Sequence, residues 1–373
     1  MNNLKKMRDK ALLLGLSSRL KSMRLSKPLT LMEVCGTHTM AIHRAGLPSL
    51  LPSNLKLLSG PGCPVCVTPA SYLDTASAIV RQYDVMLATF GDMMRVPGNS
   101  GTIADLRSEG YPVEVVYSPL GAVKLAQQKP ERHIVFLAVG FETTAPTVAA
   151  SVIYAHENRV TNFSILSSHK LVIPALETLI SDPQINVDGF ILPGHVSVVL
   201  GSEPYRLIAE HYCRACVIAG FETADIIQSI IMLAAQIEKR DFSVEIQYSR
   251  VVKSEGNIKA RAVMEKVFMP ADTVWRGFGS IPASGLALRN EYGDFDAGER
   301  FPVSIKDVPE PSGCLCGEVL RGHVEPPECT LFAKVCMPEK PVGPCMVSTE
   351  GTCAAFYRYT RKSPALTKGE KQL

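Results

Sequence analysis

The sequence predicts an α/β fold in which two similar parallel-sheet domains precede a C-terminal domain of loops and short helices. Three observations lead to this prediction. Short apolar runs alternate with amphipathic stretches from about residue 29 to residue 240, which is typical of parallel α/β layers. One four-residue turn sequence occurs twice within that region. Proline and glycine crowd residues 302–345, and six of the eleven cysteines lie between residues 314 and 353.

Seven short apolar runs have the length of buried strands, and the stretches between them have helical spacing. A leading helix is predicted over 4–24. Thr102 and Asp105 have the spacing of a capping box, which marks a helix start. Beyond the α/β region, 244–252 reads as a strand and 258–268 as a helix. The seven predicted strands span 31–34, 85–90, 113–117, 133–139, 163–167, 189–192 and 215–219.

These elements divide the chain into four parts. A parallel α/β unit repeats, and a cysteine-rich region without strand patterning follows it. Since loops rich in proline and glycine bury little apolar surface, we expect bound metal to hold that last region together. The predicted parts are 1–27 (N-terminal helix), 28–125 (first α/β domain), 126–240 (second α/β domain) and 241–373 (C-terminal domain).

The repeated turn is Gly-Phe-Glu-Thr, at 140–143 and again at 220–223. Each copy follows a predicted strand, so both lie at the carboxyl ends of strands, where open α/β sheets place their ligand sites. Two interpretations of Glu142 and Glu222 stay open. Either carboxylate can position a ligand or cap the helix that follows.

Composition and charge exclude several classes of protein. The chain has 373 residues, of which 46% are hydrophobic and 20% charged, and a net charge of +3, too mild to indicate a nucleic-acid partner. The apolar run 11–16 is shorter than a secretory signal requires. No stretch approaches the roughly 18 apolar residues of a membrane helix. We therefore expect a cytoplasmic protein with no membrane partner, in which clustered cysteines bind metal or do catalysis.

The tail cysteines leave three interpretations open. Soft thiolates select zinc, Cu(I) or iron–sulfur clusters. Four of the six could hold a 4Fe–4S cluster or a structural zinc ion, or the thiols could be unligated. Cys314 and Cys316 are too close in sequence for both to bind comfortably in one site, which leaves one of them for another task. The six are Cys314, Cys316, Cys329, Cys336, Cys345 and Cys353.

Thiols near the N-terminus suggest separate chemistry. Cys35 closes a predicted strand and precedes a helix, whose N-terminal potential lowers the pKa of a thiol. Four interpretations of His38, three residues on, stay open. It is a second metal ligand, an acid, a group that orients the loop, or a residue that only forms a buried pair with Cys35. Cys63 and Cys66 form a Cys-x-x-Cys motif, which serves as a redox dithiol or as half of a zinc site.

Six motifs together resemble the signatures of the HypD family of NiFe-hydrogenase maturation proteins. The resemblance covers the chain from about residue 29 to its C-terminus, and the motifs are long and unusual. They are 32–39 (Met-Glu-Val-Cys-Gly-Thr-His-Thr), 60–66 (Gly-Pro-Gly-Cys-Pro-Val-Cys), 194–197 (Gly-His-Val-Ser), 316–322 (Cys-Gly-Glu-Val-Leu-Arg-Gly), 343–348 (Gly-Pro-Cys-Met-Val-Ser) and 351–353 (Gly-Thr-Cys).

The resemblance implies a scaffold that assembles the Fe(CN)2CO unit of the hydrogenase active site. Partners implied by the family are the small chaperone HypC and the cyanide donor HypE, which HypF supplies with carbamoyl groups. We expect a monomer that enters hetero-complexes. The implied fold has two α/β domains and a C-terminal domain with a 4Fe–4S cluster. ATP hydrolysis has been ascribed to the family's complexes, but the sequence has no Gly-x-x-x-x-Gly-Lys-[Ser/Thr] loop.

Roles for individual cysteines follow from the same resemblance. Cys35 is the implied anchor of the Fe(CN)2CO iron, which it shares with the N-terminal cysteine of HypC, while His38 is a ligand, an acid for cyanide or an orienting group. Electrons are expected to pass from the cluster to a redox pair, Cys316 and Cys345, then to Cys63 and Cys66. The implied cluster ligands are Cys314, Cys329, Cys336 and Cys353. Whether Cys314 or Cys316 binds the cluster stays open.

A few residues have no assigned task. His169 and His195 lie on predicted strand-end loops, where they face a cleft or only solvent. Cys213 and Cys216 form a further Cys-x-x-Cys, of which Cys216 is expected to pack within a strand. The segment 275–279 is expected to be a packed loop that joins domains. The alternative function is a stand-alone iron–sulfur thiol–disulfide oxidoreductase, and a third is a zinc-stabilised binding module.

Overall fold

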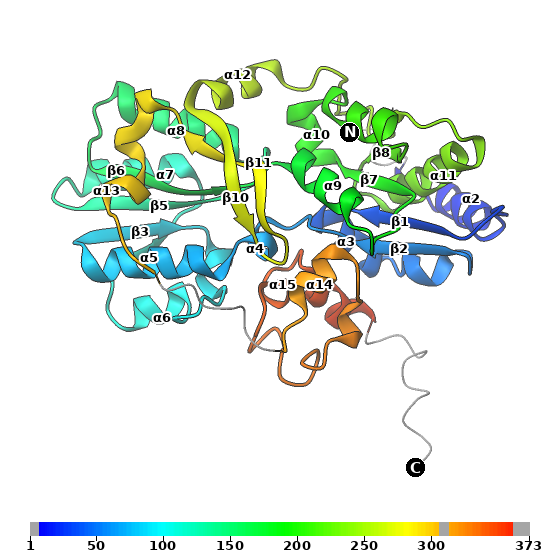
Figure 1. Cartoon of the computed structure of the whole chain (residues 1–373), viewed down its shortest axis with the longest axis horizontal. Helices are drawn as coiled ribbons and strands as arrows, with labels where there is room; N and C mark the ends of the chain where they lie inside the picture. Colours follow the sequence, from blue (N-terminus) through cyan, green and yellow to red (C-terminus); the bar gives the residue numbers. More distant parts are fainter. Residues whose placement is uncertain (1–6, 306–312, 361–373) are drawn as a thin grey trace, which may run out of the picture.

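Two parallel β-sheets form the body of the molecule, which confirms the predicted α/β class. The computed structural model describes residues 7–305 and 313–360. One sheet has the order β2-β1-β7-β8-β9 and the other β4-β3-β5-β6. Figure 1 shows the two sheets side by side. Their strands are β1 (Leu29–Glu33), β2 (Leu55–Ser59), β3 (Val85–Thr89), β4 (Val113–Val115), β5 (His133–Gly140), β6 (Phe163–His169), β7 (Gly189–Pro193), β8 (Ala215–Ala219) and β9 (Val244–Ile246).

The sheets do not follow one another along the chain. Strands β1 and β2 begin the first sheet, β3 to β6 build the second, and β7 to β9 return to the first, where β7 pairs with β1. Each of the predicted units 28–125 and 126–240 therefore contributes strands to both sheets. Parallel strands are joined by long crossovers, and such a crossover can lead to either sheet. Alternation of strands and helices identifies the elements but not their neighbours.

The helices cover both sheets and close their cores. The longest of those described, α11, packs on β7 and β8 with eleven buried residues, and its hydrophobic side faces the sheet. The main helices are α2 (Lys10–Lys21), α3 (Gly36–Arg44), α5 (Ala70–Gln82), α6 (Ile103–Ser108), α7 (Pro119–Gln128), α8 (Ala145–Glu157), α9 (Val172–Ser181), α10 (Gly194–Leu200), α11 (Thr223–Lys239), α12 (Ile258–Val267) and α13 (Ala297–Arg300). None of the helices in the described residues is long and apolar enough to cross a membrane.

Local predictions held for most elements. The strand 215–219 has the predicted bounds, and the capping box of Thr102 and Asp105 starts α6. The predicted strand 244–252 ends early, at Ile246. Within the predicted helix 4–24 the structure has α2, and residues 1–6 lie outside the described residues.

An antiparallel hairpin that the sequence did not suggest lies between the sheets in Figure 1. It consists of β10 (Phe268–Trp275) and β11 (Gly279–Leu288). The segment 275–279, predicted as a joining loop, is its turn. There Gly277 has a φ of +83°, and a Cβ on it would come within 2.4 Å of the Cα of Gly317. The turn thus docks closely on the C-terminal region.

The C-terminal region lies under the junction of the two sheets (Figure 1). Its described elements are short helices, as predicted. Two of them pack against the helices that begin at the N-terminal cysteines, α15 against α4 (Pro64–Val67, after Cys63) and α16 against α3 (after Cys35). This packing brings the tail cysteines to the N-terminal ones. The C-terminal helices are α14 (Cys316–Arg321), α15 (Pro344–Val347) and α16 (Thr352–Ala355), with short turns at Pro326–Glu328 and Phe356–Thr360.

Candidate functional site

Cys35 lies directly after β1 and is the N-cap residue of α3. Its side chain makes no capping hydrogen bond, so the sulfur is not committed to the helix. The residue is 7% exposed, and the backbone N–H groups of Thr37 and His38 and the carboxylates of Glu33 and Glu350 interact with it. The helix begins one residue after Cys35, and this start turns the backbone N–H groups of Thr37 and His38 toward the sulfur.

Two glycines bring the Cys35 loop and the Cys63 loop into contact. Gly36 donates its N–H to the carbonyl of Gly62 over 3.0 Å. A Cβ on Gly62 would lie 2.1 Å from the backbone nitrogen of Cys35, and one on Gly36 would lie 3.3 Å from the Cβ of Cys63. Only glycine permits this approach. The two cysteine motifs therefore form one site.

The pKa of Cys35 is contrary to the sequence-based expectation. Burial raises the pKa of this thiol to about 12, although the N–H groups of His38 and Thr37 favour the thiolate. The carboxylates of Glu33 and Glu350 raise the pKa further. The effect of the helix start is present, but desolvation outweighs it. Cys35 is a neutral thiol until something replaces its proton.

His38 is fully buried, and its ring is held from two sides. Its Nε2 donates to the carbonyl of Gly220 over 3.0 Å, and the ring stacks on Phe221 with centroids 4.8 Å apart. Phe221 in turn stacks on the exposed His195 at 3.9 Å. Nδ1 of His38 has no hydrogen-bond partner among the described residues. Burial lowers the pKa of His38 to about 4, so at neutral pH this ring is uncharged and its Nδ1 carries a free lone pair.

Two carboxylates complete this site, and the sequence interpretation missed both. Glu33, at the end of β1, accepts the N–H of Cys35 over 2.9 Å and the hydroxyl of Thr39. Burial raises the pKa of Glu33 to about 7. Glu350 comes from the tail and accepts the hydroxyl of Thr37 over 2.6 Å. Glu33 lies inside the motif that contains Cys35 and could have been noticed, whereas nothing in the sequence links Glu350 to it.

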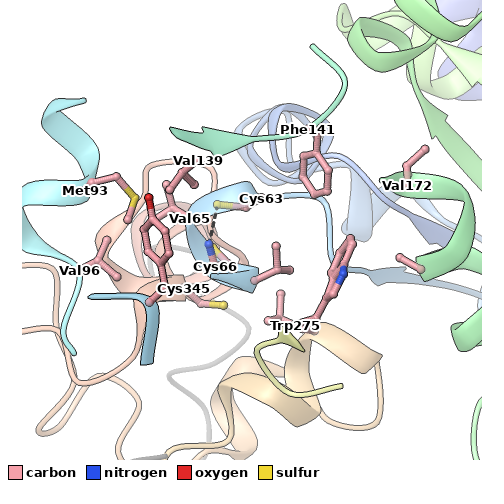
Figure 2. Packing of buried hydrophobic residues seen from close by; sticks show 14 of the residues in the cluster. Cys63, Val65, Cys66, Met93, Val96, Val139, Phe141, Val172, Trp275 and Cys345 are labelled. Atoms are coloured by element: carbon pink, nitrogen blue, oxygen red, sulfur yellow. Dashed lines mark hydrogen bonds between the residues drawn. The ribbon is translucent and has the colours of Figure 1, made fainter. Parts of the chain in front are cut away.

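Cys63 and Cys66 face each other across one turn of α4. Cys63 is the N-cap residue, and its sulfur accepts the N–H of Cys66 over 3.4 Å, drawn as the dashed line in Figure 2. Both residues are buried, at 3% and 0% exposure. Burial raises the pKa of Cys66 well above the usual value of a thiol. The pair is close enough for thiol exchange but is shielded from solvent.

Cys345 joins the tail to the N-terminal pair. Its sulfur lies 2.8 Å from that of Cys316 and also interacts with the sulfurs of Cys66 and Cys353. Figure 2 shows its side chain directed toward α4, next to Cys66. A line of neighbouring sulfurs therefore leads from the tail through Cys345 and Cys66 to Cys63, whose loop contacts Cys35.

The tail cysteines line one cavity together with apolar side chains, among them Val319, Phe332 and Met346. No group of three or more His, Cys, Asp or Glu side chains is arranged around a single metal ion in residues 7–305 and 313–360. A cubane cluster differs, because it takes one thiolate at each of four irons. All six cysteines line the cavity: Cys314, Cys316, Cys329, Cys336, Cys345 and Cys353.

Two local features of this cavity suit thiolate ligands. The sulfur of Cys336 accepts the N–H of Val342 over 3.3 Å, the kind of bond that tunes cluster thiolates. A Cβ on Gly343 would lie 2.8 Å from the sulfur of Cys314, so glycine keeps that space open. The Cys316–Cys345 pair adjoins two of the four implied ligands, because the sulfur of Cys316 interacts with that of Cys314 and the sulfur of Cys345 with that of Cys353. The donors and the apolar lining therefore suit a 4Fe–4S group.

Other residues singled out from the sequence lie away from this site. Cys216 is buried in β8, as expected, and Cys213 is exposed, so the two do not act as a pair. Glu222 caps α11 in a capping box. Glu142 caps a helix as well, but it caps α9 rather than the helix that follows it in sequence. His169 is buried at the end of β6, beside the hairpin.

Comparison with known proteins identifies the family. The HypD model, described as the hydrogenase formation hypA family, matches residues 11–360. The chain is 43% identical over 337 residues to hydrogenase maturation factor HypD of Escherichia coli K12, covering 90% of each chain. It is 42% identical over 338 residues to HypD of Cupriavidus necator, covering 88% of this chain and 89% of that one. HypD of Azotobacter vinelandii is 43% identical over 344 residues, covering 90% of both. The chain belongs to the HypD family of hydrogenase maturation factors.

Proposed function

We propose that this protein is a cytoplasmic scaffold on which the Fe(CN)2CO unit of a NiFe hydrogenase is assembled. Iron is bound at Cys35 as cargo, together with a HypC-type chaperone, and a HypE-type protein donates cyanide. One observation carries the proposal. The neighbouring sulfurs from the tail to Cys63 end beside Cys35, the residue proposed to bind iron.

Cys35 suits a transient cargo because its thiol is neutral and little exposed when no metal is present. Iron binding displaces the proton, and the N–H groups of Thr37 and His38 then stabilise the thiolate. A single protein sulfur leaves coordination positions for diatomic ligands and for a partner's donor. Exchange of the cargo is thus easier than from a closed set of four protein ligands.

His38 serves better as an acceptor or ligand than as an acid. Its Nε2–H is committed to Gly220, and its low pKa keeps the imidazolium form rare at neutral pH. The lone pair on Nδ1 is the available group. His195, exposed on the far side of Phe221, gives this site an edge at the molecular surface, where a partner can approach.

Thiol exchange along the sulfur line balances as a two-electron step. Cys345 loses its proton and attacks the sulfur of Cys66 in a Cys63–Cys66 disulfide, and Cys63 leaves with the electron pair and takes up a proton. Cys316 then loses its proton and attacks Cys345, so that Cys66 leaves as a thiol and a Cys316–Cys345 disulfide forms. Both contacts that Cys345 needs are present. The result is a reduced pair beside the iron site.

A 4Fe–4S cluster would be held by Cys314, Cys329, Cys336 and Cys353, which line the tail cavity. When bound, it supplies single electrons next to the Cys316–Cys345 pair. The chain's own part is to exclude water with apolar walls and to direct the N–H of Val342 at one of the sulfurs. A bound cluster would also contribute to the folding of the tail, since the described part of the tail contains only short helices and loops.

Infrared spectroscopy of the complex co-purified with a HypC-type chaperone tests the proposal. Wild-type complex should show cyanide and carbonyl stretches, and Cys35→Ala should remove them while the protein stays folded and brown. Cys216→Ala is a matched control, because that thiol is equally buried but lies in β8. A wild-type complex without any such bands would refute the scaffold role.

Burial favours the scaffold over a stand-alone thiol–disulfide oxidoreductase. Cys63, Cys66 and Cys345 are at most 3% exposed, which hinders attack on a disulfide of another protein. Turnover of a protein or low-molecular-weight disulfide by the isolated chain, at a rate that Cys66→Ser abolishes, would support the oxidoreductase instead.

A further inference from the structure

A second cavity, separate from all the cysteines, lies where elements of both sheets meet the hairpin. Its volume is about 240 Å³. For scale, an apolar cavity of roughly 150 Å³ accepts benzene. The space therefore admits one ring-sized molecule with a short substituent. It is lined by Glu142, Leu171, Ile173, Pro174, Leu200, Pro204, Met264, Glu265, Phe268, Pro270 and Leu286.

Glu142 is the buried polar group in this lining. The residue is 2% exposed, and its Oε1 accepts the N–H of Val172 at the start of α9 over 2.9 Å. Oε2 has no hydrogen-bond partner among the described residues. A buried acceptor without a donor costs about 1–3 kcal/mol, so such groups are normally satisfied. Helix capping explains one oxygen of this carboxylate and leaves the other without a donor.

The charge of the lining selects the ligand. Glu142 and Glu265 are its only titratable residues, and neither Lys, Arg nor His lines the cavity. Lys170 is nearby in sequence, but its Nζ donates to Thr273 over 2.9 Å and lies 6.0 Å from the Trp275 ring, so it is engaged elsewhere. The remaining walls are aliphatic, aromatic or proline. Burial raises the pKa of Glu142 to about 7, and a small organic cation beside it favours its ionised form, while the exposed Glu265 adds negative charge at the rim.

We propose that this cavity binds a small primary amine with an apolar body. Its ammonium group donates to Oε2 of Glu142, and its body lies against Leu171, Phe268 and Leu286. Because Glu142 follows β5, Leu200 follows β7 and Phe268 begins the hairpin, one ligand contacts segments attached to both sheets. Binding therefore stabilises the arrangement of the two sheets relative to each other.

Benzylamine and benzyl alcohol are matched probes, since they differ mainly in charge. We would titrate each into the full-length protein and measure dissociation constants by calorimetry. Benzylamine should bind the wild type at least about tenfold more tightly than benzyl alcohol. Glu142→Gln retains an oxygen for the N–H of Val172. It should weaken the binding of benzylamine by about tenfold or more and leave the binding of benzyl alcohol unchanged. Glu265→Gln, at the same cavity, should change the dissociation constant of either probe by less than about threefold.

A second variant guards against misfolding of the first. Ile173→Trp fills the cavity from the first turn of α9, where the side chain is only half-buried, and should abolish binding of both probes without touching Glu142. The proposal fails if benzylamine does not bind the wild type, binds no better than the alcohol, or is unaffected by Glu142→Gln and Ile173→Trp. Since the cavity contains no cysteine, none of these outcomes bears on the scaffold function.

Discussion

The sulfur of Cys316 lies 2.8 Å from that of Cys345, although 29 residues separate the two in the sequence. Both residues are buried, at 5% and 1% exposure. Cys316 begins α14 and Cys345 lies in α15, so the contact joins these two short helices. The pair is therefore a built feature of the tail, placed between the other tail thiols and Cys66.

Mild oxidation should convert this pair into a disulfide before other thiols react with one another. The expected result is a cross-linked peptide containing Cys316 and Cys345, detected by alkylation and mass spectrometry, which Cys345→Ser removes. Cys213→Ser serves as control, because that exposed thiol is far from the tail in sequence and should not alter the cross-link. Recovery of Cys316 and Cys345 as separately alkylated thiols after oxidation would contradict the prediction.

Gly62→Ala should destabilise the protein because the added methyl group has no room. Its Cβ would lie 2.1 Å from the backbone nitrogen of Cys35, and backbone cannot move aside as a side chain can. We expect a loss of about 1–3 kcal/mol in the free energy of unfolding, measured with urea. Gly15→Ala is the control. Nothing lies within 4 Å of that position in α2, so alanine there should stabilise by about 0.5–1 kcal/mol.

How far the fold could be predicted depended on burial. Strand β8 is buried along its whole length, so its apolar run marks it with the correct bounds. Strand β2 escaped notice because Lys56 interrupts its apolar run. The hairpin was missed because β10 contains Pro270 and exposes half of its residues, which hides a strand pattern. Pairing across the two sheets could not be deduced, since periodicity contains no information on which strands are neighbours.

The candidate site, too, could be predicted from the sequence only in part. Cys35, Cys63 and Cys66 were found from local motifs, and the structure places their loops in contact through Gly36 and Gly62. The approach of Glu350 to Thr37 spans 313 residues and depends on how the tail docks. The raised pKa of Cys35 also depends on burial, which a local helix-start argument omits.

Arg250→Met should destabilise the turn that holds His38. Arg250 forms two hydrogen bonds, of 2.8 and 2.5 Å, with the fully buried carboxylate of Asp225. That carboxylate also accepts the N–H of Glu222 in the turn whose Gly220 carbonyl binds His38. Removing one partner leaves a buried charge, which costs about 3–5 kcal/mol. Urea unfolding measures the loss.

A double variant distinguishes charge from packing in this pair. Arg250→Met combined with Asp225→Asn removes both charges, so it should be more stable than Arg250→Met alone. The contrary outcome is that the loss in the free energy of unfolding of the double variant equals the sum of the losses of the two single variants. In that case the two side chains act independently, and the ion pair is not what stabilises the turn.

Lys170→Met should stabilise the protein most at and below neutral pH. Lys170 is 1% exposed, and burial lowers its pKa to about 7, because the ammonium loses its hydration. An unfolded lysine has a pKa near 10.4. Between about pH 7 and pH 10 the unfolded chain therefore keeps a proton that the folded chain lacks, and the stability of the wild type rises with pH across this window. Below about pH 7 both states hold the proton, so the full cost of burying the charge remains.

Methionine has a similar length and no charge. The gain in the free energy of unfolding from Lys170→Met should therefore be a few kcal/mol near pH 6, on the order of 1.4 kcal/mol for each unit by which burial lowers the pKa. This gain should shrink toward pH 10. Urea unfolding of both proteins at several pH values measures this difference, and other titrating groups cancel in it. Lys259→Met, at an exposed position of α12, is the control substitution. A gain from Lys170→Met that is independent of pH would mean that Lys170 is charged in the folded protein, and that Thr273 and Trp275 stabilise its ammonium despite burial.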